Sequence, residues 1–444
     1  MNIVPVDYVA NAIDHISHKE ELDGKCFHLT DPKPHRIGEV LNIFADAGHA
    51  PKMALRINTK MFGFIPAYIR NMVMSLPPIL RIKGAILKDL KIPPAVLEFI
   101  NYPTRFDSRE TQKALEDSNI RLPRLAEYAA PIWDFWERNL DPDLFIDRTL
   151  GGSVKGKTIM ITGATSGIGL ATSLRLAKTD ATILLVARKE EGLIETKQLV
   201  EDLGGKAHIY VADLSSNESC DELVKQALAD HQKVDILLNN AGRSIRRSVE
   251  HSIDRFHDYE RCMQLNYFGC LKLIMGFLPT MSKQRFGHII NISSIGVLTN
   301  APRFSAYVAS KSALEAFTRC AAAEYSDTGV RFTTINMPLV KTPMIAPTKI
   351  YDYFPTLNPE QAVDLIAKAI IDKPKRVATR LGTFINVVYA LAPKVTEILF
   401  NFTFRMFKDS SAAKSGGKGA PGDEPQQMTS EQVALSQVMR GIHL

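Results

Sequence analysis

The chain has 444 residues, of which 45% are hydrophobic and 23% are charged, a composition typical of globular proteins. Its 54 Lys and Arg against 48 Asp and Glu give a net charge of +6, which is too small an excess for a dedicated nucleic-acid binder. The positive excess lies beyond residue 150, which suits an anionic cofactor or substrate there. A chain of this length predicts two folded units with tails.

The thiols and histidines exclude two further classes of protein. Because Cys26, Cys220, Cys262, Cys270 and Cys320 form no closely spaced pair, we predict reduced thiols rather than disulfides or a zinc site. The histidines show no ligand spacing, so we predict no metal. The N-terminal sequence lacks the pattern of a signal peptide, and no uncharged apolar run reaches about 18 residues. We therefore expect a cytoplasmic protein.

The first 150 residues predict a mostly helical region without a cofactor site. Helical periodicity occurs over 6–17, 38–47, 109–118 and 124–138. An apolar section with several prolines covers 62–94, and no glycine-rich loop occurs in this region. A stretch rich in Pro, Asp and Gly at 140–156 marks the boundary with the rest of the chain.

From residue 157 onward, strand-like runs alternate with helical ones. The predicted strands cover 157–162, 182–187, 207–212, 234–239, 287–293 and 331–336, and helices include 168–178, 190–203, 218–230 and 306–325. This alternation predicts an α/β fold, a Rossmann-type doubly wound parallel sheet, in a domain over 151–407. The Gly-, Ser- and Pro-rich residues 408–428 predict a disordered linker, and 429–444 a short terminal helix.

The first predicted strand runs directly into a glycine-rich loop that opens a helix. The loop contains Gly163, Thr165, Ser166, Gly167, Ile168 and Gly169. Its glycines allow the backbone to approach a pyrophosphate, whose charge the helix N-terminus stabilises. An accidental glycine-rich turn is the alternative, which the strand before and the helix after the loop disfavour.

Cofactor contacts are also expected where the next three strands end, because doubly wound sheets bind ligands at the carboxyl ends of their strands. No acidic residue ends the second strand, and Arg188 is placed there to pair with a 2′-phosphate, which predicts NADPH. A solvated surface arginine is the alternative interpretation. The third and fourth strands lead into Asp213, Leu214, Asn240, Ala241 and Gly242.

The fifth strand is followed by a candidate catalytic set. Ser294 comes first, and Tyr307 and Lys311 follow one helical turn apart, so that they share a helix face. The lysine ammonium is expected to lower the pKa of Tyr307 from its usual value of about 10. Tyr307 then acts as a general acid while Ser294 holds the substrate oxygen. A purely structural Tyr–Lys face is the alternative, which the accompanying loops disfavour.

Residues 155–345 resemble the short-chain dehydrogenase/reductase superfamily. The resemblance rests on TGATSGIG, NNAG, SS followed by YVASK, and Asn266 within QLNYFG. It implies a tetrad of Asn266, Ser294, Tyr307 and Lys311, with Asn266 fixing a proton-relay water. It also implies cofactor contacts from Pro338, Val340 and Thr342. Leu339 stands where the family usually has glycine, so we expect a reshaped nicotinamide end of the pocket.

A narrower similarity connects the stretches NNAGRSIRRSVEHSIDRFHDYERCMQLNYFG, INISSIGVLTNAPRFSAYVASKSALEAF and MPLVKTPMIAPTKIY to bacterial fatty acyl-CoA reductases of wax-ester biosynthesis. It implies reduction of long-chain fatty acyl-CoA to fatty aldehyde, with further reduction to alcohol left open. Residues 1–145 look like the distal part of an extended-type reductase module whose nucleotide-binding half is missing.

Substrate contacts are predicted in three places. Arg243, Arg246 and Arg247 could bind the phosphates of CoA, or form a solvated loop. Residues 343–354 and 383–407 could line an acyl channel or rest peripherally on a membrane or lipid surface, or else be buried core. A reductase of preformed ketones or fatty aldehydes and a non-enzymatic lipid-related binding protein remain the alternative functions. We also expect a homo-oligomer.

Overall fold

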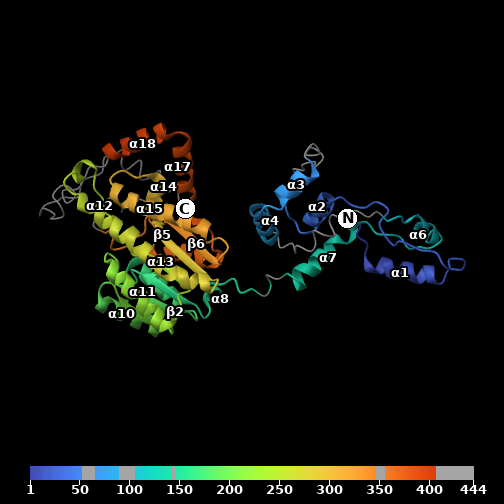
Figure 1. Ribbon diagram of the computed structural model, residues 1–444, viewed down its shortest axis with the longest axis horizontal. Helices are drawn as coiled ribbons and strands as arrows, with labels where there is room; N and C mark the ends of the chain where they lie inside the picture. Colours follow the sequence, from blue (N-terminus) through green and yellow to red (C-terminus); the bar gives the residue numbers. More distant parts are fainter. Residues whose placement is uncertain (53–65, 90–105, 142–143, 145, 347–355, 407–444) are drawn as a thin grey trace. The chain divides into compact units, whose positions relative to one another are not determined.

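The computed structural model describes residues 1–52, 66–89, 106–141, 144, 146–346 and 356–406. The chain divides into two compact units, Met1–Ile146 and Asp147–Leu444 (Figure 1). The linker predicted over 408–428 and the helix predicted over 429–444 lie outside the described residues.

The first unit is helical, as the sequence predicted. Its described helices are α1 (Val6–Ser17), α2 (Ile37–Ala47), α3 (Ala67–Met74), α4 (Pro77–Asp89), α6 (Arg109–Ala114) and α7 (Leu125–Asn139). Tyr8, Ala12 and Leu115 form a small buried cluster, which joins α1 to the end of α6. Leu115 caps α6, so this helix is shorter than the predicted 109–118.

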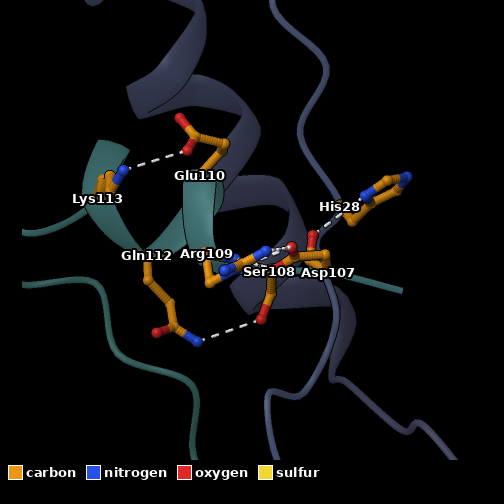
Figure 2. A network of polar contacts seen from close by, with 7 residues as sticks. All are labelled: His28, Asp107, Ser108, Arg109, Glu110, Gln112 and Lys113. Atoms are coloured by element: carbon orange, nitrogen blue, oxygen red, sulfur yellow. Dashed lines mark hydrogen bonds and ion pairs between the residues drawn. The ribbon is translucent and has the colours of Figure 1, made fainter. Parts of the chain in front are cut away.

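A polar network surrounds the start of α6 (Figure 2). Asp107 accepts hydrogen bonds from the backbone N–H and the guanidinium of Arg109, which lower the pKa of Asp107 to about 2. Gln112 donates to Ser108, and the Nδ1 atom of His28 lies 3.1 Å from the carbonyl oxygen of Asp107. Because the Arg109–Asp107 pair is exposed to solvent, we attribute to this network only local order at the helix start.

The second unit contains a seven-stranded, wholly parallel sheet, which confirms the predicted Rossmann-type fold. The strands are β1 (Thr158–Thr162), β2 (Thr182–Ala187), β3 (Lys206–Val211), β4 (Ile236–Asn239), β5 (Gly287–Ser294), β6 (Val330–Met337) and β7 (Arg376–Val377). Their spatial order is β3-β2-β1-β4-β5-β6-β7. The order reverses at β1 and β4, and the glycine loop and the NNAG segment follow these two strands.

Helices cover both faces of this sheet. In chain order they are α8 (Leu150–Val154), α9 (Gly167–Leu176), α10 (Glu190–Asp202), α11 (Asn217–His231), η3 (Glu250–Ser252), α12 (Phe256–Met263), η4 (Gln264–Gly269), α13 (Cys270–Lys283), α14 (Ile295–Thr299), α15 (Ser305–Glu324), α16 (Pro359–Asp372), α17 (Arg380–Leu391) and α18 (Pro393–Met406). The sequence analysis gave no helix over 256–283 and no strand at β7.

The alternation of side chains along the strands creates two cores. Ile159 and Ile161 pack into a cluster with α9, α10 and α16, whereas Met160 points the other way, into a cluster with α11, α13 and α15. A strand that is buried on both faces is predominantly apolar, and β1 is fully buried along its length, with polar side chains only at its ends, Thr158 and Thr162. This explains why the strand runs were recognisable in the sequence.

One buried histidine in the sheet has its tautomer fixed by a neighbour. The Nε2 atom of His288 lies 2.9 Å from the Thr333 hydroxyl oxygen, and that hydroxyl donates to the carbonyl oxygen of Pro374. Nε2 must therefore carry the hydrogen, and Nδ1 has no hydrogen-bond partner in the described structure. Burial lowers the pKa of His288 to about 3, and the nearby Lys373 and Arg331 act in the same direction.

We predict that this histidine makes the second unit sensitive to acid. The unfolded chain binds the proton at its ordinary pKa of about 6.5, so stability is complete above that pH and falls by up to ~1.4 kcal/mol per pH unit below it. His288→Gln should flatten this pH dependence, whereas His208→Gln, at an exposed position on β3 beside His231, should change it much less. Urea unfolding should be followed by amide exchange of the sheet, because Trp133 and Trp136 both lie in the first unit. Equal pH slopes for the two variants would contradict the assignment.

Candidate active site

The glycine loop has the backbone geometry that a phosphate cradle requires. Gly163 and Gly167 adopt φ angles of +65° and +53°, a region that favours glycine. A Cβ atom at Gly169 would lie 2.1 Å from the carbonyl oxygen of Gly163, so the loop is folded tightly against the first turn of α9. Ser166 is the N-cap residue of α9, but its side chain accepts no hydrogen bond from the helix. This side chain therefore does not satisfy the backbone N–H groups of the first turn. These residues fit a pyrophosphate group.

The hydroxyl of Thr162 joins this loop to the end of β4. It accepts the backbone N–H groups of both Asn240 and Ala241 at 2.9 Å. The side-chain amide of Asn240 in turn donates hydrogen bonds to the carbonyl oxygens of Thr162 and Gly163, at 2.9 and 3.3 Å. Thr162 was not among the predicted site residues, although its place at the end of a strand before the glycines could have suggested this role.

A cavity of about 330 Å³ lies beside these two loops. Thirteen of the predicted site residues line it: Gly163, Ser166, Gly167, Ile168, Asn240, Ala241, Gly242, Ser294, Tyr307, Lys311, Pro338, Val340 and Thr342. Thr165 packs against Gly192, while Gly169 is buried beneath the loop. The exposed Arg188 and Asp213 follow β2 and β3, and Leu214 is buried beside Gly269, so these three lie outside the cavity lining.

The cavity also has an apolar side that the sequence analysis did not identify. Thr299, Ala301, Phe304 and Val308 contribute to it from α14, α15 and the connection between them. Leu339 lines it as well, and its carbonyl oxygen accepts the backbone N–H of Leu357. Leu339 was expected to reshape the pocket, and it lines the cavity. No motif marks the other positions, and only the proximity of some of them to Ser294 and Tyr307 in sequence could have pointed to them.

Tyr307 and Ser294 are in direct contact in this cavity. Ser294 accepts the backbone N–H of Gly296 at 3.1 Å and hydrogen-bonds the Tyr307 phenol. Burial raises the pKa of Tyr307, the hydrogen bond to Ser294 opposes this shift, and Cys262 adds to it. The protein's own groups therefore do not lower the pKa of Tyr307 as expected, because burial of the phenol outweighs its hydrogen bond with Ser294.

Lys311 lies on the same helix, where it is almost completely buried. Its Nζ atom donates to the carbonyl oxygen of Ile292 at 2.8 Å. Burial lowers the pKa of Lys311, an effect that Cys270, Cys262 and Glu315 oppose. The Lys311 ammonium is therefore held by the carbonyl oxygen of a strand residue and not by a carboxylate. Its direction follows from the helix and the strand that position it.

Asn266 lies behind the cavity wall, in the short π-helix η4. Its Oδ1 accepts the backbone N–H of Arg243, and its Nδ2 donates to the carbonyl oxygen of Arg243 and to Ser310. A Cβ atom at Gly242 would lie 3.3 Å from Asn266 Oδ1 and 3.5 Å from Lys311 Nζ, so both side chains border this glycine. The structure thus brings Asn266 and Lys311 together; the relay water stays a prediction.

The three arginines after NNAG do not form one surface. Arg247 is buried, its backbone N–H donates to Arg303, and its Nε lies 3.1 Å from the carboxylate of the buried Asp258. Arg255 and His257 contact the same carboxylate. Arg247 therefore belongs to an internal ion pair, and the expectation that it contacts CoA is wrong. Arg243 and Arg246 are partly exposed.

We predict that Arg247→Met destabilises the second unit by about 3 kcal/mol, because a buried carboxylate loses one of its cationic partners. Arg188→Met, at an exposed position, should leave the unfolding temperature within about a degree of the wild-type value. Thermal unfolding followed by circular dichroism measures both. An Arg247→Met variant with wild-type stability and a selectively raised KM for acyl-CoA would restore the original interpretation.

Three further findings concern metal ligands, membrane-spanning helices and thiols. Within the ranges that the structure describes, no three His, Cys, Asp or Glu side chains gather closely enough to hold a metal ion. Among the described helices, none is both long and apolar enough to cross a membrane. All five cysteines are free thiols.

The fold and this cavity define a class of oxidoreductases that use nicotinamide dinucleotides. The chain belongs to the short-chain dehydrogenase family, whose model matches residues 157–350. A fatty acyl-CoA reductase of Acinetobacter baylyi is 56% identical over 261 residues, which cover 59% of this chain and 88% of that protein. A fatty acyl-CoA reductase of Mycobacterium tuberculosis is 42% identical over 258 residues, 57% of this chain and 88% of that protein.

A metagenomic short-chain oxidoreductase in complex with NADP is 26% identical and matches 51% of this chain and 98% of that chain, with a TM-score of 0.44. The family resemblance predicted from the sequence motifs is confirmed by the family match and the curated relatives.

Proposed function

We propose that this protein reduces long-chain fatty acyl-CoA thioesters to fatty aldehydes and uses NADPH as reductant. The observation that carries the proposal is the single cavity in which Ser294 and Tyr307 face the glycine loop. The 56% identity to a protein named as a fatty acyl-CoA reductase supports the substrate class. Two residues that can bind and protonate a carbonyl oxygen, placed beside a dinucleotide cradle, are what such a reduction requires.

The protein's own residues act on the carbonyl oxygen. When bound, the nicotinamide cofactor supplies a hydride to the carbonyl carbon. Ser294 donates a hydrogen bond to the oxygen, and Tyr307 transfers its proton as negative charge develops there. The hemithioacetal then loses its C–S bond: the hydroxyl proton passes to the departing sulfur, and the products are free CoA thiol and aldehyde. The raised pKa of Tyr307 suits this direction, because the neutral phenol is the form that donates.

Lys311 and Asn266 are assigned to the supply of protons. Both border Gly242, and Lys311 is fixed by the Ile292 carbonyl while Asn266 fixes the Arg243 backbone. We propose that protons reach the Tyr307 phenol by way of Asn266 and Lys311, from the interior side of the cavity.

The preference for NADPH rests on Arg188. This side chain is exposed at the carboxyl end of β2, and it makes no ion pair within the described part of the chain. A guanidinium in that position complements a 2′-phosphate, for which it offers two parallel hydrogen bonds.

A second candidate function is the reduction of a preformed ketone or fatty aldehyde. The cavity volume of about 330 Å³ favours it, since this lies at the small end of ligand sites, which span roughly 300–1,000 Å³. The same Ser294 and Tyr307 would serve, but no C–S bond would break. The two functions therefore differ in whether a thiol is released.

One assay separates these functions. NADPH oxidation and thiol release are followed together with palmitoyl-CoA, and NADPH oxidation alone with hexadecanal. Acyl-CoA reduction predicts equal amounts of NADPH consumed and thiol released when aldehyde is the product, and two NADPH for each thiol when alcohol is the product. Turnover of hexadecanal with no thiol release from palmitoyl-CoA would support the second candidate.

We predict that Tyr307→Phe lowers kcat by about 10²–10⁴-fold while the Kd for NADPH changes only a few-fold. The phenol donates the proton, whereas the glycine loop holds the cofactor. Tyr210→Phe is a matched control, because this buried tyrosine hydrogen-bonds Asp230 beneath α11 and away from the cavity lining. A loss of cofactor affinity that parallels the loss of activity would refute these roles.

We also predict that Arg188→Asp shifts the cofactor preference toward NADH. A carboxylate repels the 2′-phosphate and accepts hydrogen bonds from ribose hydroxyls. The ratio of kcat/KM for NADPH to that for NADH should fall by at least about tenfold, and Lys189→Asp, the adjacent exposed cation, should lower it less. An unchanged ratio for Arg188→Asp would show that Arg188 is only a surface residue.

A further inference from the structure

Helices α17 and α18 each present apolar side chains to solvent. Leu391 at the end of α17 is 81% exposed, and the other side chains of this face are more than 45% exposed. The set, which we call the α17–α18 stripe, consists of Phe384, Val387, Leu391, Val395, Ile398, Leu399 and Phe402. Their spacing of three, four and seven residues places them on one side of each helix. The interpretation of 383–407 as buried core is therefore wrong for these residues.

The opposite side of the two helices packs on the domain. A Cβ atom at Gly382 would lie 3.1 Å from both Ile295 and Leu298 of α14. Phe404 stacks on the guanidinium of Arg303, 4.1 Å from the ring centre. Because Gly382 and Phe404 fall about half a helical turn away from the stripe, the stripe is directed outward rather than left exposed by loose packing.

The stripe lies next to the candidate active site. Ile295 lines the main cavity, and α17 packs on it through Gly382. Ala301 and Val308 line that cavity and also a second one of about 560 Å³, whose wall includes Phe404 of α18. Through Gly382 and Phe404, both helices therefore pack close to the cavity, and the stripe lies on their outer side.

Charge and length indicate what covers this face. The helices have 12 and 14 residues, too short to span a bilayer, which needs about 20. Arg380, Lys394 and Arg405 are exposed beside the stripe, whereas Glu397, the one acidic side chain of α17 and α18, projects away from it. Apolar side chains flanked by cations are the pattern of helices that lie in the interface of anionic membranes.

We propose that the α17–α18 stripe docks this protein on an anionic lipid bilayer. A long acyl chain and its aldehyde both partition into lipid, so docking would bring the candidate active site close to where they reside. Only this benefit of docking rests on the proposed function. The docking itself rests on the exposed apolar stripe and on the cations beside it.

The test uses the full chain and sedimentation with vesicles of phosphatidylcholine alone or with about 30% phosphatidylglycerol. The wild type should bind the anionic vesicles, more weakly at high salt. Ile398→Asp with Phe402→Asp should lower this binding at least about tenfold. The matched control is Ile194→Asp with Leu199→Asp, two residues of similar exposure on α10, which Figure 1 shows at the other end of the second unit. This control should bind as the wild type does.

A charge variant separates the contribution of the cations to vesicle binding from that of the apolar side chains. Lys394→Glu with Arg405→Glu should weaken binding to anionic vesicles while leaving any binding to neutral vesicles unchanged. Circular dichroism and unfolding temperature should show that all variants remain folded. Thiol release from soluble palmitoyl-CoA without vesicles should persist in the variant Ile398→Asp with Phe402→Asp. If the wild type and all variants lack this activity, but binding to vesicles still depends on the stripe, the proposed function fails and the docking proposal stands.

Several outcomes would overturn the docking proposal. These are the absence of wild-type binding to either kind of vesicle, and equal binding by the stripe variant. A dimer in gel filtration that the stripe variant dissociates would assign the face to a second copy of the chain. Binding lost instead on Leu80→Asp with Ile82→Asp, exposed residues of α4, would assign it to the first unit.

Discussion

The site depends on the hydroxyl of Thr162, which connects the ends of β1 and β4. Two backbone N–H groups of the NNAG segment donate to this one oxygen, and Asn240 donates back to the carbonyls at the start of the glycine loop. These contacts are made at the point where the strand order reverses, so the two loops cannot separate without leaving buried polar groups unpaired. The cavity floor is therefore rigid, as binding of a dinucleotide requires.

A second polar framework holds helix α15 against the sheet. Glu315, one turn after Lys311, is buried and accepts hydrogen bonds from Ser293 and Asn336. Arg376 of β7 lies 3.5 Å from its other oxygen, so a carboxylate that would be costly to bury alone is shared by three elements. This arrangement links α15, which carries Tyr307 and Lys311, to three neighbouring strands of the sheet.

Sequence patterns were sufficient for the parts of the fold that local chemistry determines. Most of the strands were recognisable because parallel strands buried on both faces are predominantly apolar, and β3 because buried and exposed side chains follow one another along it. The glycine loop was recognisable because φ angles near +60° demand glycine at 163 and 167. The family resemblance came from these same motifs. The two-residue β7 carries no such pattern, and β7 was missed because its position depends on the distant Glu315.

Other features could not be predicted because they depend on contacts distant in sequence. Nothing in RSIRRS distinguishes Arg247, which is buried on Asp258, from its neighbours at the surface. The raised pKa of Tyr307 follows from desolvation, which sequence spacing does not report. Likewise, the apolar periodicity of 383–406 is the same for a buried helix and for one that faces a membrane; only the packing of Gly382 and Phe404 gives the outward direction. The similarity of residues 1–145 to part of another reductase module stays a prediction.

The account's central claim is that one cavity brings the dinucleotide and the reacting carbonyl together between the glycine loop and Tyr307. A crystal structure of the full chain with NADP⁺ tests this most directly. The account predicts the pyrophosphate on the amides of residues 163–169, the 2′-phosphate at Arg188, and the nicotinamide beside Tyr307 and Leu339. A dinucleotide bound elsewhere, or bound here with its nicotinamide turned away from Ser294 and Tyr307, would contradict it.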